Sequence, residues 1–172
     1  MALIRPVRGQ HPQIHADAWC AENAVVIGDV QIGAKSTIWY NVTIRGDVHS
    51  IRIGKETNVQ DGTVIHCTFE EHATEVGDRV TIGHLVMLHG CTIGAGCLIG
   101  MGSIVMDGVV IGENSLVGAG SLVTEGSQFP PGSLILGRPA KLKRALTPEE
   151  IKNLQKSADN YLMYATWYQP QG

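Results

Sequence analysis

An aliphatic residue recurs at every sixth position through most of this chain, and this period constrains the fold more than any other feature. Glycine follows many of these residues, which permits a tight turn after each short strand. Such a repeat predicts a triangular coil of about eighteen residues per turn, with one aliphatic side chain pointing inward from each side. The series, interrupted by two insertions and one deletion, comprises Val26, Ile32, Ile38, Ile44, Ile53, Val59, Ile65, Val76, Ile82, Leu88, Ile93, Ile99, Val105, Ile111, Val117 and Val123.

The repeat predicts an all-β solenoid in which parallel strands of successive coils lie about 4.8 Å apart. The predicted coils occupy residues 20–126. An antiparallel sandwich would also alternate apolar and polar residues, but it would not hold a six-residue period with glycine after the apolar position. We therefore expect a parallel β-helix, although the period itself does not tell which way the coil winds.

The sequence changes character after the last predicted coil. Residues 127–146 are rich in proline and glycine and are predicted to lead the chain out of the coil. Thr147 can then cap a helix over residues 147–168, with Pro148 at its first position and Glu150 three residues after the cap. An apolar stripe follows at helical spacing and must cover the flank of a β-helix, the chain's own or a neighbour's. The stripe comprises Ile151, Leu154, Ala158, Tyr161, Leu162 and Ala165.

Length and composition limit the remaining choices. The chain has 172 residues, enough for a single domain over 1–172, and a net charge of -3 that suggests neither a nucleic-acid nor a membrane partner. No apolar segment has the length of a signal peptide or a membrane span, so we expect a cytoplasmic location. The four cysteines lack C-x-x-C spacing and are expected to be buried free thiols. Cys67, next to a candidate metal ligand, is also open to a ligand or redox role.

Two of the seven histidines occupy equivalent positions in the predicted coil. His66 follows the inward residue Ile65, and His89 follows the inward residue Leu88. One coil plus the insertion after Ile65 separates the two histidines, so their backbones should stack about 4.8 Å apart. Tetrahedral zinc needs ligand nitrogens roughly 3.3 Å apart, a spacing that two stacked imidazoles can reach by leaning together.

His84 is the candidate for a third ligand. It lies two residues after Ile82, on a different side of the coil from His66 and His89. A neighbouring chain packed around a threefold axis could direct its His84 at that pair, which predicts a homotrimer with a site at each interface. Three protein ligands with one open position are typical of catalytic rather than structural zinc. The alternative is a set of polar interface histidines without a metal.

Other polar side chains should surround the histidines in the same register. Arg45 lies one coil below His66, and Asp61 lies one coil below His84. In the trimer, Asp61 of one chain should contact Arg45 of another. This ion pair would align the two chains more than it would stabilise the interface. Gln60 could direct its amide at the open metal position, or it could be an ordinary solvated strand residue.

Several short motifs follow one another in the order Ile44-Arg45-Gly46-Asp47, Asn58-Val59-Gln60-Asp61-Gly62, Ile65-His66, Gly83-His84 and Leu88-His89-Gly90. In combination they resemble the successive motifs of gamma-class carbonic anhydrases, over roughly residues 10–165. Members of that family are hexapeptide-repeat proteins with a left-handed coil. Left-handed winding breaks the usual right-handed crossover rule, so the expectation of a left-handed β-helix rests on this resemblance.

The resemblance also implies an activity and a set of roles. The implied activity is reversible hydration of CO2 to bicarbonate, because zinc lowers the pKa of its bound water to about 7. Gln60 would orient the hydroxide, Tyr161 would reach the site from the helix, and Asn58 would be a nearby polar support. The implied ligands of Zn2+, or of Fe2+ or Co2+ in its place, are His66, His84 and His89. The implied interface network comprises Arg45, Asp47 and Asp61.

The sequence departs from the family pattern along the path for protons. Val48 stands where the archetypal enzyme has a Glu, and the acidic loop over residues 67–75 is shorter than its counterpart. Glu70, Glu71 and His72 could substitute as proton carriers. We therefore expect strong metal binding with slow hydration of CO2.

Two other functions stay open on the sequence. A hexapeptide-repeat acyltransferase would share the coil and the trimer, and would use a single histidine as general base with acyl-CoA bound between coils. A metal-loaded subunit of a larger assembly would keep the metal site but would not hydrate CO2 at a catalytic rate. The in-register histidines, together with Arg45 and Asp61, favour a metal site over the acyltransferase.

Overall fold

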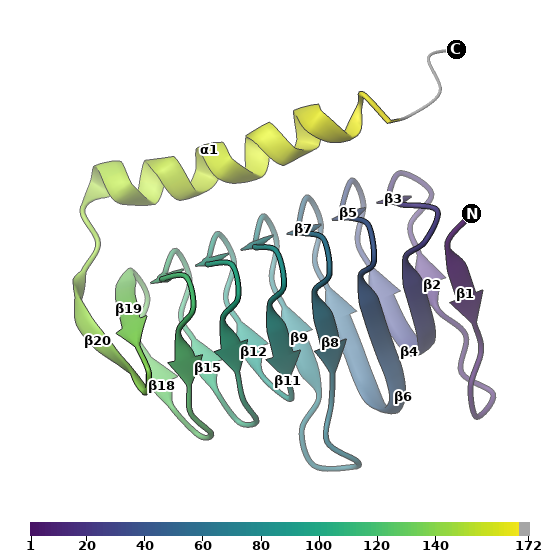
Figure 1. Ribbon diagram of the computed structural model, residues 1–172, viewed down its shortest axis with the longest axis horizontal. Helices are drawn as coiled ribbons and strands as arrows, with labels where there is room; N and C mark the ends of the chain where they lie inside the picture. Colours follow the sequence, from purple (N-terminus) through teal and green to yellow (C-terminus); the bar gives the residue numbers. More distant parts are fainter. Residues whose placement is uncertain (169–172) are drawn as a thin grey trace.

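The computed structural model describes residues 1–168 (Figure 1). The chain winds into a stack of short parallel strands with a helix along one flank, which confirms the predicted left-handed β-helix. β4 and β6 are long enough to run around a corner of the coil, so two of its sides join into one 12-stranded sheet, while the remaining side forms an 8-stranded sheet.

The strands divide among the sides of the coil, and neighbours on a side belong to successive turns. One side holds β1 (Leu3–Arg5), β4 (Val25–Ile32), β6 (Thr43–Ile53), β8 (Val64–His66), β11 (Met87–His89), β14 (Ile104–Val105) and β17 (Leu122–Val123). The next side holds the second halves of β4 and β6 with β2 (Gln13–Ile14), β9 (Thr74–Val76), β12 (Thr92–Ile93), β15 (Val110–Ile111) and β18 (Gln128–Phe129). The last side holds β3 (Trp19–Cys20), β5 (Thr37–Ile38), β7 (Asn58–Val59), β10 (Thr81–Ile82), β13 (Leu98–Ile99), β16 (Leu116–Val117), β19 (Ser133–Gly137) and β20 (Ala140–Ala145).

The core is a set of aliphatic ladders that run the length of the coil. On the side that carries β8 and β11, each inward residue pairs with its equivalent in the next turn, and all of them are fully buried. Burial of these side chains is the main favourable term for folding. This ladder comprises Val26, Ile44, Ile65, Leu88, Val105 and Val123.

The coil begins earlier and ends later than the repeat predicts. β1 pairs in parallel with β4, and β3 with β5, so the first turn precedes residue 20. At the other end Phe129 and Ile135 pair with the preceding turn, and so extend the six-residue series into the predicted exit segment 127–146. Pro131 and Gly132 form a corner turn there rather than an exit. The chain leaves the coil only at β20, which runs antiparallel to β19.

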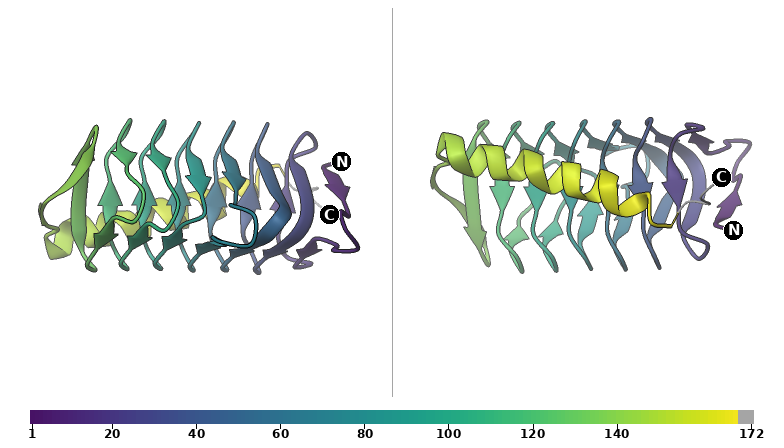
Figure 2. Two further views of the ribbon diagram at one scale, coloured as in Figure 1. Left: turned by 90° about the horizontal axis from the view of Figure 1, so that it is seen from below. Right: turned by 90° about the horizontal axis from the view of Figure 1, so that it is seen from above.

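Helix α1 (Pro148–Ala165) begins with the predicted capping box. The Glu150 N–H donates to the Thr147 hydroxyl (3.2 Å), and the Thr147 N–H donates to the Glu150 carboxylate (2.8 Å). The helix lies along the chain's own coil, against β5, β7 and β10 (Figures 1 and 2). It therefore covers the side of the coil that carries Asn58 and Gln60. Its buried residues are Leu154, Ala158 and Ala165.

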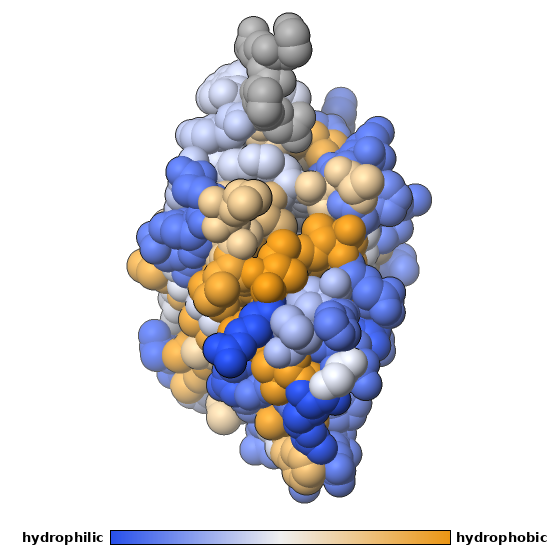
Figure 3. Space-filling view, turned by 90° about the vertical axis from the view of Figure 1, so that its right-hand side faces the viewer, coloured by the Kyte–Doolittle hydropathy of each residue, from blue (hydrophilic) through white to orange (hydrophobic). Residues whose placement is uncertain are grey.

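The N-terminal end of the coil shows apolar side chains bordered by polar ones (Figure 3). Leu3 and Ile4 of β1 are among the exposed large hydrophobic residues. β1 pairs with β4 alone among the described strands, so it is the edge strand of this side.

All four cysteines are free thiols, as predicted. Cys67, Cys91 and Cys97 are buried, and Cys20 is partly buried. Burial raises the pKa of Cys91 and of Cys97 to about 12, so both are protonated at neutral pH. Within residues 1–168, no helix combines the length and the apolar character needed to cross a membrane.

Candidate metal centre

His66 and His89 lie one above the other on adjacent turns, as their register predicts. They are direct partners in the pairing of β8 with β11. His66 Nδ1 and His89 Nε2 face each other across 3.1 Å. That separation is close to the roughly 3.3 Å expected between two nitrogen ligands of tetrahedral zinc.

The other nitrogen of each ring, which points away from the pair and is called the outer nitrogen here, faces a carboxylate. His66 Nε2 lies 3.0 Å from Asp47 Oδ1, and His89 Nδ1 lies 2.8 Å from Asp107 Oδ1. A carboxylate can only accept a hydrogen bond, so each of these nitrogens donates its proton outward, and in a neutral ring the remaining nitrogen then carries a lone pair that faces the other ring. Two lone pairs at this distance repel unless a cation lies between them. A carboxylate behind each imidazole is also the usual arrangement around zinc-binding histidines, so the pair fits a metal ion.

Asp47 is shared between His66 and Arg45. Arg45 Nη1 donates to Asp47 Oδ2 across 2.6 Å, while the other carboxylate oxygen accepts from His66. Burial opposes ionisation of Asp47, but the hydrogen bonds from Arg45 and His66 outweigh it, so the pKa of Asp47 lies below its ordinary value. Within one chain the partner of Arg45 is thus Asp47, and the predicted contact of Arg45 with Asp61 of a neighbouring chain stays a prediction.

His84 lies at a corner of the coil, above Asp61. The Leu85 N–H donates to the Asp61 carbonyl, which stacks the two corners. His84 Nδ1 lies 2.9 Å from Asp61 Oδ2, so Nε2 is the ring nitrogen that can bind a cation. The side chains of His84 and Asp61 are 42% and 41% exposed, whereas that of His66 is 16% exposed. His84 therefore faces outward from its own chain.

A single chain does not assemble the predicted three-histidine site. Within residues 1–168, no three His, Cys, Asp or Glu side chains lie in an arrangement that could hold a metal ion. The structure brings His66 and His89 together and places His84 on a different side of the coil. The predicted site therefore requires a third ligand from another molecule.

Gln60 and Asn58 form a buried polar chain under helix α1. Gln60 is 5% exposed, and its Nε2 donates to Asn58 Oδ1 (3.0 Å). Asn58 Nδ2 donates in turn to Thr81 Oγ1 (3.0 Å), which donates to Ser157 of the helix (3.4 Å). This burial excludes the alternative interpretation of Gln60 as an ordinary solvent-exposed strand residue. Asn58 accepts one of the two N–H groups of the Gln60 amide, so the carbonyl oxygen and the second N–H of Gln60 are the groups that can act on a ligand.

Tyr161 lies on the face of α1 that packs against the coil. Its ring meets Trp39 edge to face, with centroids 5.5 Å apart. Burial, followed by the negative charge of Asp61, raises the pKa of the Tyr161 hydroxyl above its ordinary value. The hydroxyl is therefore protonated at neutral pH.

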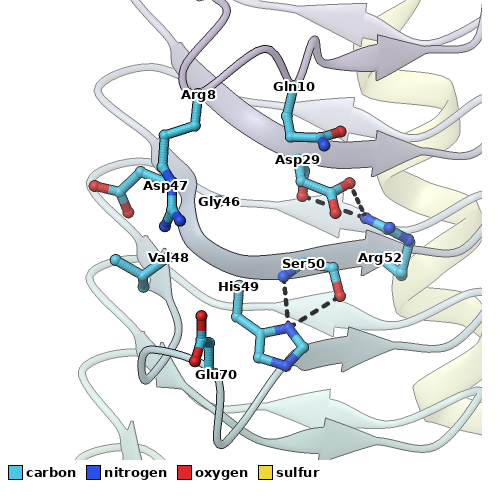
Figure 4. A pocket seen from close by; sticks show the side chains of 10 residues that line it. All are labelled: Arg8, Gln10, Asp29, Gly46, Asp47, Val48, His49, Ser50, Arg52 and Glu70. Carbon is cyan, nitrogen blue, oxygen red and sulfur yellow. Dashed lines mark hydrogen bonds and ion pairs between the residues drawn. The ribbon is translucent and has the colours of Figure 1, made fainter.

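A pocket of about 470 Å3 lies beside Asp47, at the corner where β6 bulges away from β4 (Figure 4). Asp47 and Val48 line it, but the three candidate histidines do not. His49 Nδ1 accepts the Ser50 N–H at 2.7 Å. Val48 packs partly against the core, so no carboxylate occupies the position of the family's Glu. Glu70 reaches the same pocket from the loop after β8.

Asp107 is the residue of this centre that the sequence reasoning missed. It belongs to the turn after His89, eighteen residues further along the chain. The same coil arithmetic that stacked the two histidines would have identified it. Its second partner, Thr68, comes from the insertion after β8, and no repeat predicts where an insertion folds.

Comparisons with known proteins agree with this architecture. The family model described as bacterial transferase hexapeptide (six repeats) matches residues 90–125. The chain is 53% identical to a probable carbonic anhydrase of Methanocaldococcus jannaschii, over 83% of this chain and 89% of that one. It is 43% identical to the mitochondrial gamma carbonic anhydrase 2 of Arabidopsis thaliana, over 90% of this chain and 57% of that longer one. A solved hexapeptide transferase family protein from Anaplasma phagocytophilum is 47% identical, with a TM-score of 0.93, and the match covers 97% of this chain and 98% of that one. The chain belongs to the gamma-carbonic-anhydrase-like family of hexapeptide-repeat proteins.

Proposed function

We propose that the protein is a trimeric metalloenzyme that hydrates CO2 reversibly and slowly. The observation that carries this proposal is the pair of ring nitrogens, His66 Nδ1 and His89 Nε2, that face each other across 3.1 Å while a carboxylate faces the other nitrogen of each ring. His66, His89 and His84 of an adjacent subunit would hold the ion, and three protein ligands would leave it able to bind water. The native ion is Zn2+, with Fe2+ or Co2+ able to take its place.

The surface around His84 supports a subunit interface. Leu85 is 71% exposed and Met101 is 58% exposed. The two lie at the same corner of successive turns, because the Gly102 N–H donates to the His84 carbonyl. Exposed large apolar side chains beside a half-exposed Asp–His pair fit a contact with another copy of the chain. Asp61 would then approach Arg45 of the neighbour, which Asp47 holds in place.

The chain's own residues provide binding, orientation and exclusion of water. The bound ion would supply Lewis-acid activation of water at neutral pH. The Gln60 carbonyl, held by Asn58, would orient that water, and Tyr161 would border the space from the helix. The aromatic and aliphatic side chains around Tyr161 would keep the site apolar enough for CO2.

Transfer of the released proton to solvent is the weak step. Val48 has no ionisable group, and Glu70 reaches the pocket beside Asp47 from a loop rather than from the coil. General acid–base groups contribute about 10²–10⁴-fold where they are well placed. The absence of such a group from position 48 supports slow turnover.

Metal analysis combined with a CO2 hydration assay tests this function. Protein purified without oxygen should hold close to one metal per chain and hydrate CO2 measurably. His66→Ala and His89→Ala should lose both the metal and the activity, whereas His11→Ala, a change outside the proposed site, should keep both. Acetyl-CoA binding without stoichiometric metal would instead identify an acyltransferase. Full metal loading without hydration, together with a co-purifying protein, would identify an assembly subunit.

Mixed trimers test whether two chains build each site. His84→Ala chains keep the His66–His89 pair, and His89→Ala chains keep His84. If each site lies between subunits, co-assembly of these two inactive variants restores one intact site in every mixed trimer. A site built within one chain would stay metal-free in every mixture, and that result would contradict the proposal. Mixtures of His66→Ala with His89→Ala are the matched control, because they restore no site in either case.

A further inference from the structure

We propose that Asp107, held by Thr68, is a positioning residue for His89. It determines which ring nitrogen of His89 carries the proton, and so keeps Nε2 available to a metal. This inference rests on the proposed metal site, but its first consequence concerns the metal-free protein. Asp107 does not contact the open metal position. It acts through the ring of His89.

Asp107 connects three turns of the molecule. Its Oδ1 lies 2.8 Å from His89 Nδ1, and its Oδ2 accepts from the Thr68 hydroxyl at 3.0 Å. Thr68 belongs to the loop after β8, which a bridge between Thr68 and His72 closes. The Gly108 N–H donates to the Gly90 carbonyl, so the backbone beside Asp107 is tied to the backbone beside His89. Both carboxylate oxygens therefore have fixed partners.

The carboxylate decides which nitrogen of His89 carries the proton. Opposite Asp107, Nδ1 must donate, because an unprotonated Nδ1 would set a lone pair against the carboxylate oxygen. Without Asp107 the proton could move to Nε2. His89 would then donate directly to His66 Nδ1, which is 3.1 Å away. The two candidate ligands would satisfy each other and close the space that the ion needs.

Gly90 leaves the space that this arrangement requires. It has a positive φ of 55°, and a Cβ at this position would collide with Asp107 Oδ1. The same Cβ would lie 2.7 Å from His72 Cβ. A side chain at position 90 would therefore push the carboxylate away from His89. Glycine here serves the contact between Asp107 and His89 as well as the turn.

Three variants separate this role from a general structural one. Asp107→Ala removes the acceptor, whereas Asp107→Asn keeps an oxygen for His89 and a polar partner for Thr68. Asp78→Ala is the matched control, because Asp78 also bridges two turns, accepting the Lys55 N–H at 2.9 Å, but contacts none of the candidate histidines. All three proteins should be assayed as the full chain in its native assembly, with thermal unfolding recorded to confirm the fold.

Nitrogen NMR of histidine side chains in the metal-free protein is the first readout. Above the pH at which histidine titrates, His89 should be protonated on Nδ1 in the wild type, in Asp107→Asn and in Asp78→Ala. In Asp107→Ala the proton should move to Nε2. Protonation of His89 on Nε2 in the wild type, or an unchanged tautomer in Asp107→Ala, would overturn the inference.

Metal affinity is the second readout, measured by competition with a chelator and by the visible spectrum of bound Co2+. Asp107→Ala should bind about 10–100-fold more weakly, the usual cost of removing a carboxylate behind a zinc histidine. Asp107→Asn should lose less, and Asp78→Ala should bind as the wild type does. Equal losses in Asp107→Ala and Asp78→Ala would overturn the inference. If no variant binds metal, including the wild type, the proposed function fails, while the NMR result still decides the role of Asp107.

Discussion

The turns that carry the histidines differ from the turns that follow them. Beyond β12 the coil is regular, and contacts such as that between Ser115 and Ser133 join residues eighteen apart. Around the histidines, insertions lengthen the turns, and His66 contacts a residue 23 positions away. One insertion forms the bulge of β6 that carries Asp47, and the other forms the loop that carries Thr68.

In this solenoid the site lies where insertions interrupt the regular turns. The inward ladder passes through both regions without interruption, because the insertions fall at corners and leave the aliphatic residues in register. The regular turns supply a rigid frame, and the interrupted turns supply side chains for which the strict repeat has no room. Rigid elements that position loop residues are a general feature of functional sites.

The largest effect should come from the regular frame. Ile99→Ala removes a fully buried side chain, and should lower the free energy of unfolding by about 2–5 kcal/mol. Metal affinity at neutral pH should be unchanged, because Ile99 lies outside the site. Denaturant unfolding and metal titration measure the two quantities. Leu142→Ala, at an exposed position, is the control and should change neither quantity. A loss of affinity in Ile99→Ala would mean that the two regions are coupled.

Removal of Asp47 should affect the site more than the frame. Asp47→Ala should weaken metal binding about 10–100-fold, because His66 loses the partner of Nε2. Asp29→Ala is closely matched, since Asp29 pairs with Arg52 at 2.7 Å as Asp47 pairs with Arg45 at 2.6 Å, but contacts no histidine. Chelator competition should show the loss in Asp47→Ala alone. Similar losses in both would assign the effect to the arginine pairs.

Two glycines with positive φ compare the regions directly. Gly120 lies in the regular turns, has φ of 68° and has open space around its missing Cβ, so Gly120→Ala should cost only the left-handed strain of about 1–2 kcal/mol. Gly90→Ala should cost more, and should also weaken metal binding, because the new Cβ would displace Asp107. Thermal unfolding and metal titration of both variants test this. Equal behaviour of the two would show that the contact with Asp107 is unimportant.

The effect that should be smallest at neutral pH concerns the buried thiols of both regions. Burial raises the pKa of Cys91 and Cys97 from 9.0 to about 12. The folded protein therefore keeps protons that the unfolded chain releases, and the free energy of unfolding should fall as the pH rises between about 9 and 12. The slope should be at most about 1.4 kcal/mol per pH unit for each thiol. Cys91→Ala and Cys97→Ala should reduce the slope equally. A reduction in only one would indicate that the core opens more easily in one region.

Much of the architecture was predictable because the repeat is a local pattern with a geometric consequence. An inward aliphatic residue every sixth position implies the coil, and the coil implies that His66 and His89 stack, since residues one turn apart must pair. The predicted ends were less accurate. Phe129 continues the series with an aromatic residue, and prolines at a corner resemble an exit in the sequence although they permit another turn.

The coil, its inward ladder, the capped helix and the vertical alignment of His66 with His89 could all be read from the amino-acid sequence, because each follows from spacing along one chain. Three contacts became visible only in the folded chain: Gln60 is buried against Asn58, Asp47 and Asp107 face the outer nitrogens of the two rings, and Thr68 holds Asp107. These contacts depend on where insertions fold and how side chains turn at the corners. The period of the strands specifies neither, because it constrains only the residues that face the core.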